Sequence, residues 1–231
     1  MLAGSAGSGK TTIALQYLVN GIAMGEPGIY VTFEQMPDQI YRDALSFGWD
    51  LRKLESEDKF RLVCTSPKLL VEGSGAEELL DGPIKDVGAK RIVVDSVSHL
   101  SMFVPDGDLR KEAYRMVNYF KTKGLSSVLL WESQQEYGHS FSVTDMGMSF
   151  LVDAIILLKF IEIESTIRRA MVVLKMRGSD HDKRLREYHI TSKGVKLEEA
   201  FTQYQGLMSG SPTKVGSQKF FELFSKAGKE K

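Results

Sequence analysis

A glycine-rich octapeptide near the start of the chain is the segment best suited to chemistry. Residues 4–11 read GSAGSGKT, which matches the pattern G-x-x-x-x-G-K-[ST] at Gly4, Gly9, Lys10 and Thr11. In this pattern the glycines let the backbone curl so that successive N–H groups point at phosphate oxygens. The lysine reaches the β- and γ-phosphates, and the hydroxyl completes the shell of a magnesium ion. The spacing predicts a site for ATP and Mg2+, in preference to a chance glycine-rich turn.

Two carboxylates follow apolar runs and would complete this site. Asp95 ends the run RIVVD, and Glu34 follows the run GIYVTF. The carboxyl ends of parallel strands form the edge where open α/β sheets bind their ligands. We expect Asp95 to bind Mg2+, and Glu34 to face the metal and to orient or deprotonate the attacking water. The alternatives are that Asp95 caps the next helix and that Glu34 is a solvated charge at a strand end.

The elements that must position these residues alternate along the first half of the chain. Apolar residues at helical spacing and a proline at the start of one segment predict helices, and short apolar runs predict strands. The expected helices span 11–24, 37–48, 75–88 (with a Gly-Pro interruption) and 108–123, and the expected strands span 28–33, 60–64, 91–95 and 126–132. Such alternation predicts a parallel sheet with helices on both faces.

The second half of the chain changes character. The runs DAIILLKFIEI (153–163) and RRAMVVLKMR (168–177) lie a few residues apart and predict an antiparallel hairpin, with EYHIT (187–191) as a further strand. Antiparallel strands are commonly added at the edge of a parallel sheet. We expect one ATPase domain over 1–205 and a flexible tail over 206–231. The tail would end in an amphipathic segment with Phe220, Leu223 and Phe224 on one face.

Composition narrows the class of protein. Lys plus Arg and Asp plus Glu are both 30, so the basic excess typical of nucleic-acid binders is missing. The sequence contains no apolar run long enough for a membrane helix and no signal-peptide pattern. The single cysteine, Cys64, lies in the run FRLVC and is expected to be a small buried residue. These features favour a cytoplasmic globular protein.

The motifs together resemble a known superfamily. The combination of GSAGSGKT, TFE and VVDS resembles the RecA superfamily of P-loop ATPases, and the stretch LKMRGSDHDKRLREYHITSKGV is similar to the C-terminal ATPase domain of the KaiC family. The runs DAIILLKFIEI and SGSPTK are similar to that domain too, so the resemblance covers nearly the whole chain. It implies a RecA-like α/β fold, Mg2+-dependent ATP hydrolysis, and a homo-oligomeric ring, expected to be a hexamer, with ATP between subunits.

The resemblance also assigns roles to single residues. It implies that the phosphates and Mg2+ are held by Gly7, Ser8, Gly9, Lys10, Thr11 and Thr12. Phe47 matches an aromatic residue placed against the adenine, although a core residue at a helix end explains it equally well. Lys175 and Arg177 match a Lys-x-Arg pair that is inserted into the neighbouring subunit's nucleotide. Further contacts from that side are implied for Arg169, Met176, Ser179, His181 and Lys183.

The Lys-x-Arg pair, here called the finger, has a physical rationale. Lys175 and Arg177 alternate along a predicted strand and so share one face. An arginine supplied by a neighbour neutralises charge that develops on the γ-phosphate. The alternative is that both charges protect an edge strand against aggregation.

Three positions depart from the family pattern. Gln35 follows Glu34 where two adjacent glutamates are common, which weakens the assignment of the base. Ser149 and Phe150 stand where the family phosphorylates a Ser-Thr pair, so half of that acceptor site is missing. Only residues 1–3 precede Gly4, where a full central strand is expected, so we expect the sequence to begin inside a longer chain.

Three rival functions remain open. The first is a serine autokinase that uses Ser149 as the phosphoryl acceptor. The second is a recombinase-like DNA-binding ATPase, which would need basic or aromatic loops, whereas the segment 134–150 contains Glu136 and Asp145 and no Lys or Arg. The third is a signalling adaptor whose tail docks a protein partner, which is compatible with ATP hydrolysis. The leading hypothesis is a KaiC-like ATPase ring in signalling or regulation.

Overall fold

A computed structural model describes residues 1–71, 75–104, 108–133 and 149–215 of the chain. The helices are α1 (Lys10–Ala23), α2 (Pro37–Leu45), α3 (Leu51–Ser56), α4 (Pro67–Val71), α5 (Ala76–Val87), the 3-10 helix η1 (Val97–Met102) and α6 (Leu109–Thr122). The strands are β1 (Leu2–Gly4), β2 (Gly28–Thr32), β3 (Phe60–Cys64), β4 (Arg91–Asp95), β5 (Ser126–Glu132), β6 (Ala154–Ile163), β7 (Thr166–Met176), β8 (Arg186–Thr191) and β9 (Gly194–Ala200), with the short pair β10 (Tyr204–Gln205) and β11 (Thr213–Lys214).

One nine-stranded sheet runs through the described part of the chain, in the order β3-β2-β4-β5-β1-β6-β7-β8-β9. The strands from β3 to β6 are parallel, and β7, β8 and β9 continue the sheet in antiparallel pairs. The predicted mixed sheet is therefore confirmed. β1 occupies the middle of the order, between β5 and β6, so the P-loop that follows it emerges near the centre of the sheet.

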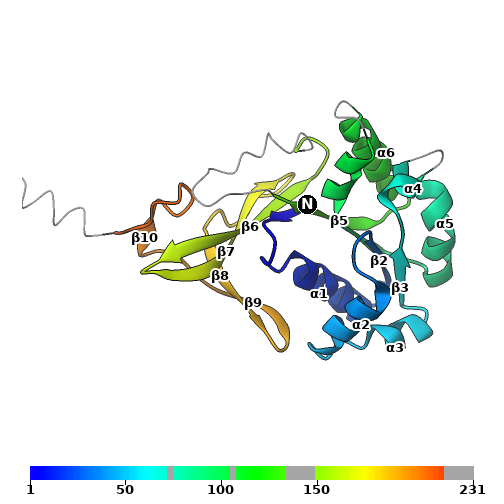
Figure 1. The fold of residues 1–231 in the computed structure, drawn as a ribbon, viewed down its shortest axis with the longest axis horizontal. Helices are drawn as coiled ribbons and strands as arrows, with labels where there is room; N and C mark the ends of the chain where they lie inside the picture. The colour runs from blue at the N-terminus through cyan, green and yellow to red at the C-terminus, as the bar shows by residue number, and fades with distance from the viewer. Residues whose placement is uncertain (72–74, 105–107, 134–148, 216–231) are drawn as a thin grey trace, which may run out of the picture.

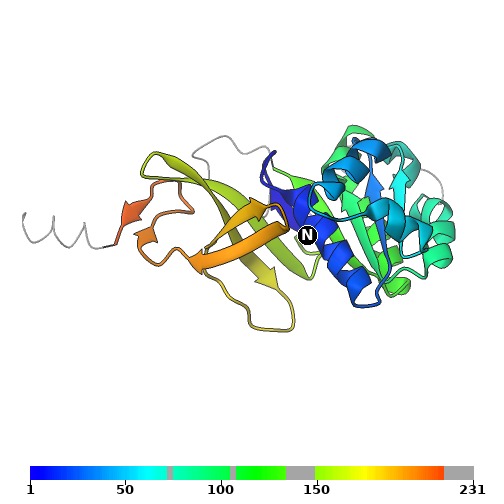
Figure 2. The same cartoon turned by 90° about the horizontal axis from the view of Figure 1, so that it is seen from below.

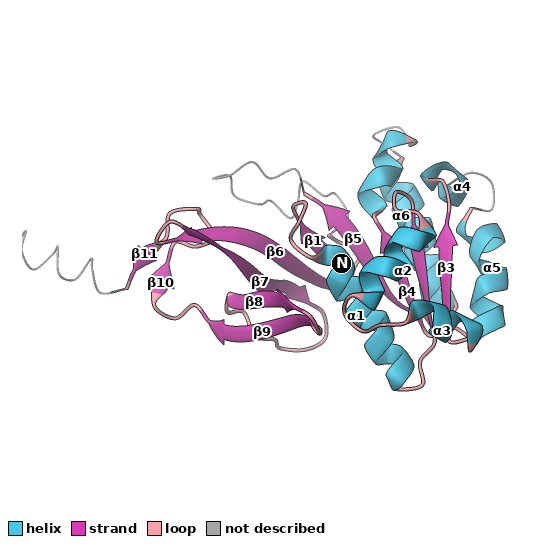
Figure 3. Cartoon of the chain, turned by 60° about the horizontal axis from the view of Figure 1, so that its bottom comes forward, coloured by secondary structure: helices cyan, strands magenta, loops and turns pink. Residues whose placement is uncertain are grey.

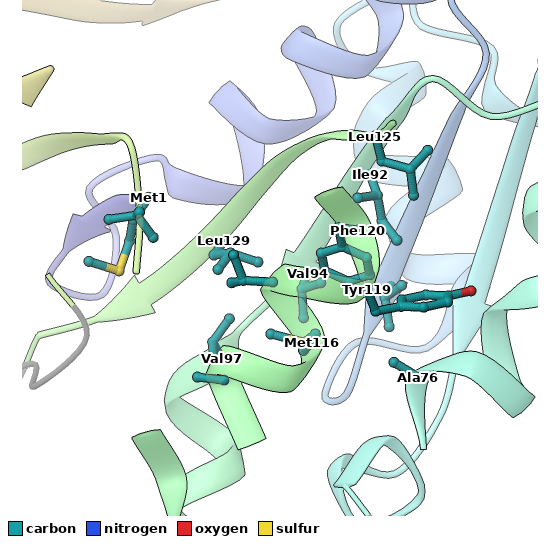
Figure 4. Packing of buried hydrophobic residues seen from close by; sticks show 14 of the residues in the cluster. Met1, Ala76, Ile92, Val94, Val97, Met116, Tyr119, Phe120, Leu125 and Leu129 are labelled. Carbon is teal, nitrogen blue, oxygen red and sulfur yellow. The ribbon is translucent and has the colours of Figure 1, made fainter. Parts of the chain in front are cut away.

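Helices cover both faces of the parallel part, as predicted. One core cluster joins α4, α5 and α6 to one face, with Leu70, Leu80 and Phe120 among its buried members. Figure 4 shows part of this cluster, where Phe120 and Met116 from α6 lie beside Ile92 and Val94 of β4. The second cluster packs α1, α2 and α3 on the opposite face. Figure 1 shows these helices gathered around β2–β5.

Strands β6–β9 extend beyond the helix-covered body and form a wing (Figures 1 and 3). Hydrogen bonds at two positions connect this wing to the P-loop and to helix α1, which follows it. The buried Tyr188 hydroxyl of β8 donates to the Ser8 carbonyl at 2.5 Å. The Gln16 side chain of α1 donates to the Val195 carbonyl of β9 and accepts from the Val195 N–H, at 3.2 and 2.7 Å. Figure 2 shows the wing on the opposite side of α1 from the helical body. The wing thus supports the P-loop from outside the parallel sheet.

Three local expectations need correction. Cys64 is exposed rather than buried, because it is the last residue of β3, the edge strand of the sheet. Helix α5 continues through Pro83 instead of breaking there. The preceding Gly82 has no Cβ to collide with the proline ring, so this position tolerates helical geometry. The strand β9 was not anticipated, because its sequence, GVKLEEA, has three charged residues and no continuous apolar run.

Two further predictions concern segments that lie partly or wholly outside the described residues. The tail was predicted at 206–231, and its first part forms β11, which pairs with β10 through Tyr204 with Lys214 and Gln205 with Thr213. The amphipathic segment 219–231 lies outside the described residues. So do residues 134–148, which include Glu136 and Asp145 and on which the argument against DNA binding depends.

Candidate nucleotide site

The P-loop leaves the sheet at Gly4 and enters helix α1 at Lys10. Gly4 pairs with Glu132 on one side and Leu158 on the other. A Cβ at Gly4 would lie 2.9 Å from the Leu158 carbonyl oxygen and 2.8 Å from the Ser8 Oγ, so only glycine fits. Gly9 has a φ of 92°, which favours glycine, and a Cβ there would meet Ile190 of β8 at 2.8 Å. The motif glycines are therefore required by the geometry of the loop.

Lys10 is buried inside the curve of its own loop. Its Nζ donates to the carbonyl oxygens of Gly4 and Ser5, both at 3.0 Å. Burial lowers the pKa of this ammonium, and the carboxylates of Glu132, Asp95 and Glu34 oppose that shift. In the described part of the chain, both hydrogen-bond acceptors of this ammonium are neutral carbonyl oxygens. A phosphate in the loop would offer it anionic oxygens in their place.

Asp95 accepts hydrogen bonds from two elements at once. The Thr11 hydroxyl of α1 donates to Asp95 Oδ2 at 2.9 Å, and the Tyr30 hydroxyl of β2 donates to the same oxygen at 2.5 Å. Burial raises the pKa of the Asp95 carboxyl, whereas both hydrogen bonds lower it. Because both donors use Oδ2, neither occupies Oδ1. A hydroxyl and a carboxylate in contact at the end of a P-loop are oxygen ligands of the type that Mg2+ prefers, so these residues fit that ion.

Glu34 lies beyond the end of β2, in the same region. Its Oε1 is 2.5 Å from Nε2 of His99 in η1. The Phe33 N–H donates to the Asp95 carbonyl at 3.2 Å, which ties the segment before Glu34 to the end of β4. The Glu34 charge also acts on the pKa values of Lys10 and Asp95. The structure therefore brings the four residues Lys10, Thr11, Asp95 and Glu34 to one edge of the sheet.

Among the described residues, the finger residues Lys175 and Arg177 do not contact the P-loop edge of their own chain and instead contact the segment that precedes β6. The Lys175 Nζ donates to the carbonyl oxygens of Ser149 and Val152 at 2.6 and 2.8 Å. Arg177 donates to the Phe150 carbonyl at 2.7 Å and lies 3.5 Å from the Asp153 carboxylate. All these partners precede β6, at the amino end of a strand that runs parallel to β1.

The register of β6 shows how the finger and the P-loop are separated. Gly4 is level with Leu158 of β6, whereas Lys175 pairs with Ile155, nearer the amino end. Positions 155 and 158 are about 10 Å apart along an extended strand. The finger side chains point away from the P-loop of their own chain. The same region contains Ser149.

Arg169 differs from the finger residues with which the sequence grouped it. It pairs with Phe160 of β6, and its guanidinium lies 5.5 Å from the centre of the Phe160 ring. Phe160 in turn lies 3.9 Å from where a Cβ on Gly7 would be. The Arg169 Nε is buried and has no hydrogen-bond partner in the described structure. Arg169 thus lies beside the P-loop of its own chain, not with Lys175.

The remaining predicted contacts are spread over exposed segments. Met176 ends β7 and is exposed, and Ser179, His181 and Lys183 follow in the connection to β8. Lys183 lies 3.1 Å from Asp180, an exposed pair of little energetic weight. Phe47 stacks on Trp49, with ring centres 4.9 Å apart, and Trp49 packs against the core cluster of α1. A structural role for Phe47 therefore has a visible contact, and its place against adenine stays a prediction.

Comparisons with known proteins agree with this geometry. A family model described as "ATPase: KaiC" matches residues 1–201. The chain belongs to the KaiC ATPase family. Among curated relatives, it is 34% identical to the Circadian clock oscillator protein KaiC of a Nostoc species over 95% of its own length and 42% of the relative's. Its identity to the proteins of that name from Synechococcus elongatus and Thermostichus vulcanus is 33% and 32%, with the same coverage.

Family membership fixes the coarse assignments. The fold is RecA-like, with the P-loop and Asp95 at the carboxyl edge of a parallel sheet. The chain is a KaiC-type P-loop ATPase domain, which implies ATP binding. It spans about two fifths of the length of the curated relatives that it matches, 42% in each case above. None of the helices in the described ranges has the length and apolarity that a membrane span requires.

Three side chains in the site were missed from the sequence. Tyr30 lies in the run GIYVTF, which predicted only a strand, whereas its hydroxyl reaches Asp95. His99 and Ser96 lie in the segment directly after Asp95, where short polar residues are a signal of a site at a strand end. The signal was present in the letters SVSH, but the pairing with Glu34 requires the three-dimensional structure.

Replacing Tyr30 with Phe tests the partly buried contact between its hydroxyl and Asp95. Tyr30→Phe removes one hydroxyl and leaves the partly buried Asp95 carboxylate with one donor fewer. Hydrogen bonds to charged groups contribute about 1.5–3 kcal/mol, so we expect a loss of that size in the free energy of unfolding of the nucleotide-free protein, measured by urea denaturation. The matched control is Tyr17→Phe, whose hydroxyl bonds to Ser126 at the surface, with an expected loss of about 0.5 kcal/mol or less. Equal losses in the two variants would contradict this role of Tyr30.

Proposed function

We propose that this chain hydrolyses ATP with Mg2+ at the P-loop edge and does so as part of a homo-oligomeric ring. The observation that carries the proposal is the convergence of Lys10, the Thr11–Asp95 pair and Glu34 on one edge of the sheet. Chemically this set contains a phosphate-binding cation, oxygen ligands for a metal and a carboxylate that can act on water. Family membership supports the same reaction class.

Each group would have a distinct task. The backbone N–H groups of the loop and the start of α1 bind phosphate oxygens, and Lys10 neutralises charge on the β- and γ-phosphates. Thr11 and Asp95 would hold Mg2+, which when bound neutralises further charge on those phosphates. Glu34 would accept a proton from the attacking water or orient it in line with the γ-phosphate. Its Oε2 is available for this, since the His99 contact is to Oε1.

The finger would complete the site from a neighbouring subunit. Lys175 and Arg177 face the amino end of β6, away from the P-loop of their own chain. In a head-to-tail ring, that end of one subunit meets the nucleotide edge of the next, and the arginine can neutralise charge on the γ-phosphate. ATP would then be part of each interface, so nucleotide binding would stabilise the ring. We propose six subunits, following the family resemblance.

The names of the relatives suggest a general biological role for this chain. Their name, Circadian clock oscillator protein, describes a regulatory protein, and we propose that ATP turnover here changes ring shape or affinity for a protein partner in signalling or regulation. The segment after residue 205 is a candidate docking site for that partner. A cytoplasmic location fits the composition, and we propose no nucleic-acid partner because the chain has no net basic charge.

Loss of the P-loop lysine should abolish the reaction. Lys10→Ala removes the cation that contacts the transferred phosphoryl group, and we expect phosphate release to fall at least about 100-fold. The measurement is steady-state phosphate release with Mg-ATP, with Lys59→Ala, a surface lysine paired with Glu57, as the control. Unchanged phosphate release by Lys10→Ala would refute the assignment of this loop as the active site.

Mixing two inactive variants tests whether the finger acts between subunits. Arg177→Ala should lose on the order of 10³-fold in rate, and Lys10→Ala should also be inactive. In mixed rings some interfaces combine an intact P-loop from Arg177→Ala with an intact finger from Lys10→Ala. Phosphate release should therefore recover in part on mixing, whereas either variant alone should not recover. If subunit exchange is demonstrated and no activity returns, the finger does not act in trans.

An autokinase is the second candidate, because the Ser149 carbonyl accepts from the finger residue Lys175. This contact would place Ser149 near a neighbour's γ-phosphate in the proposed ring. We expect phosphorylation to be weak or absent, since Phe150 replaces the second acceptor and Gln35 replaces a second carboxylate. Intact-mass spectrometry after incubation with Mg-ATP measures this directly, with Ser149→Ala as the control. A stoichiometric gain of one phosphate on Ser149 would favour the kinase.

A further inference from the structure

His99 links the end of β2 to the end of β4. Its ring is mostly covered, with 15% of the side chain exposed, whereas the Glu34 side chain is 63% exposed. Nε2 of the ring lies 2.5 Å from Glu34 Oε1, and Nδ1 lies 2.9 Å from Ser96 Oγ and 3.3 Å from the Ser96 carbonyl. A mostly exposed carboxylate with several rotatable bonds is thus held by a ring whose own orientation is fixed.

A chain of short contacts sets the orientation of the ring. Ser96 Oγ lies 2.6 Å from Ser98 Oγ, and the Glu132 N–H of β5 donates to Ser98 Oγ at 3.3 Å. The ring position is therefore tied to the backbone of β5 as well as to β4. In the tautomer that carries its proton on Nε2, this N–H donates to Glu34 and Nδ1 accepts from the Ser96 hydroxyl. Both ring nitrogens then have hydrogen-bond partners.

The backbone on the Glu34 side is also held. The Gln35 N–H donates to Thr32 Oγ1 at 3.3 Å, and the Phe33 N–H donates to the Asp95 carbonyl. These bonds fix the turn after β2 but not the Glu34 side chain, which has His99 as its contact in the described structure. Other charged groups near this region are Lys10, Asp95 and Glu132.

We propose that His99 is a positioning residue for ATP hydrolysis, which holds Glu34 through Oε1 so that Oε2 faces the attacking water. This proposal rests on the proposed function and deepens it. It explains how a single carboxylate followed by Gln35, rather than by a second glutamate, could be kept in a productive orientation. Positioning of this kind changes the rate of the chemical step and leaves nucleotide binding unchanged, because His99 touches neither the P-loop nor the Thr11–Asp95 pair in the contacts above.

Two substitutions separate the ring nitrogens. The amide nitrogen of His99→Gln can occupy the place of Nε2 and keep the contact to Glu34. The shorter His99→Asn can keep only the contact of Nδ1 with Ser96. We expect His99→Asn to lower kcat about 10- to 100-fold with KM and the Kd for ADP unchanged, and His99→Gln to retain most of kcat. A Glu34→Gln background should make His99→Asn silent, because the group that it positions has already lost its charge.

The readouts distinguish this proposal from the one on which it rests. Wild-type protein and Lys10→Ala are measured in the same assay, and absence of Lys10-dependent turnover would reject the proposed function itself. With that turnover present, equal kcat for His99→Gln and His99→Asn would overturn the positioning role. So would a loss by His99→Asn that persists in full in the Glu34→Gln background. ADP binding is measured for every variant, and a matching loss of ADP affinity would assign His99 to the fold instead.

Discussion

The partly buried carboxylate of Asp95 is the constraint on which the arrangement of the site depends. A carboxylate removed from water is costly unless donors satisfy it, and burial raises its pKa here. The donors come from two other elements, Thr11 of α1 and Tyr30 of β2. Satisfying one side chain therefore fixes the P-loop helix, the strand before Glu34 and the end of β4 relative to one another. The elements that carry the residues proposed to bind phosphate, metal and water are thereby held in one arrangement.

A second constraint separates the two halves of the proposed catalytic set. The P-loop belongs to the carboxyl edge of the parallel strands, as ligand sites in open α/β sheets do. Lys175 lies near the end of β7 and Arg177 directly follows that strand. Because β7 runs antiparallel to β6, the finger lies at the end of the sheet opposite the P-loop. In a single chain the P-loop residues and the finger residues therefore lie at opposite ends of the sheet. This geometry supports the proposal that a neighbouring copy closes the site.

Much of the fold could be predicted from local patterns. Apolar patterns predicted α1, α2, α5 and α6 and strands β2–β5, but not the short helices α3, α4 and η1. The P-loop pattern and Asp95 predicted which edge of the sheet would bind nucleotide. Contacts between distant segments could not be predicted in this way. Tyr30 reads as an ordinary apolar strand residue until its hydroxyl meets Asp95, and His99 gains meaning only beside Glu34. Arg169 was grouped with the finger by likeness alone, whereas strand pairing places it beside Phe160 and the P-loop.

The central claim is that the active site is completed between subunits, and the dependence of the rate on protein concentration tests it most directly. Phosphate release per subunit is measured across a dilution series with saturating Mg-ATP, with light scattering on the same samples. A shared site predicts that the rate per subunit falls in parallel with the assembled fraction. A rate per subunit that stays constant while the protein dissociates to monomers would contradict the account.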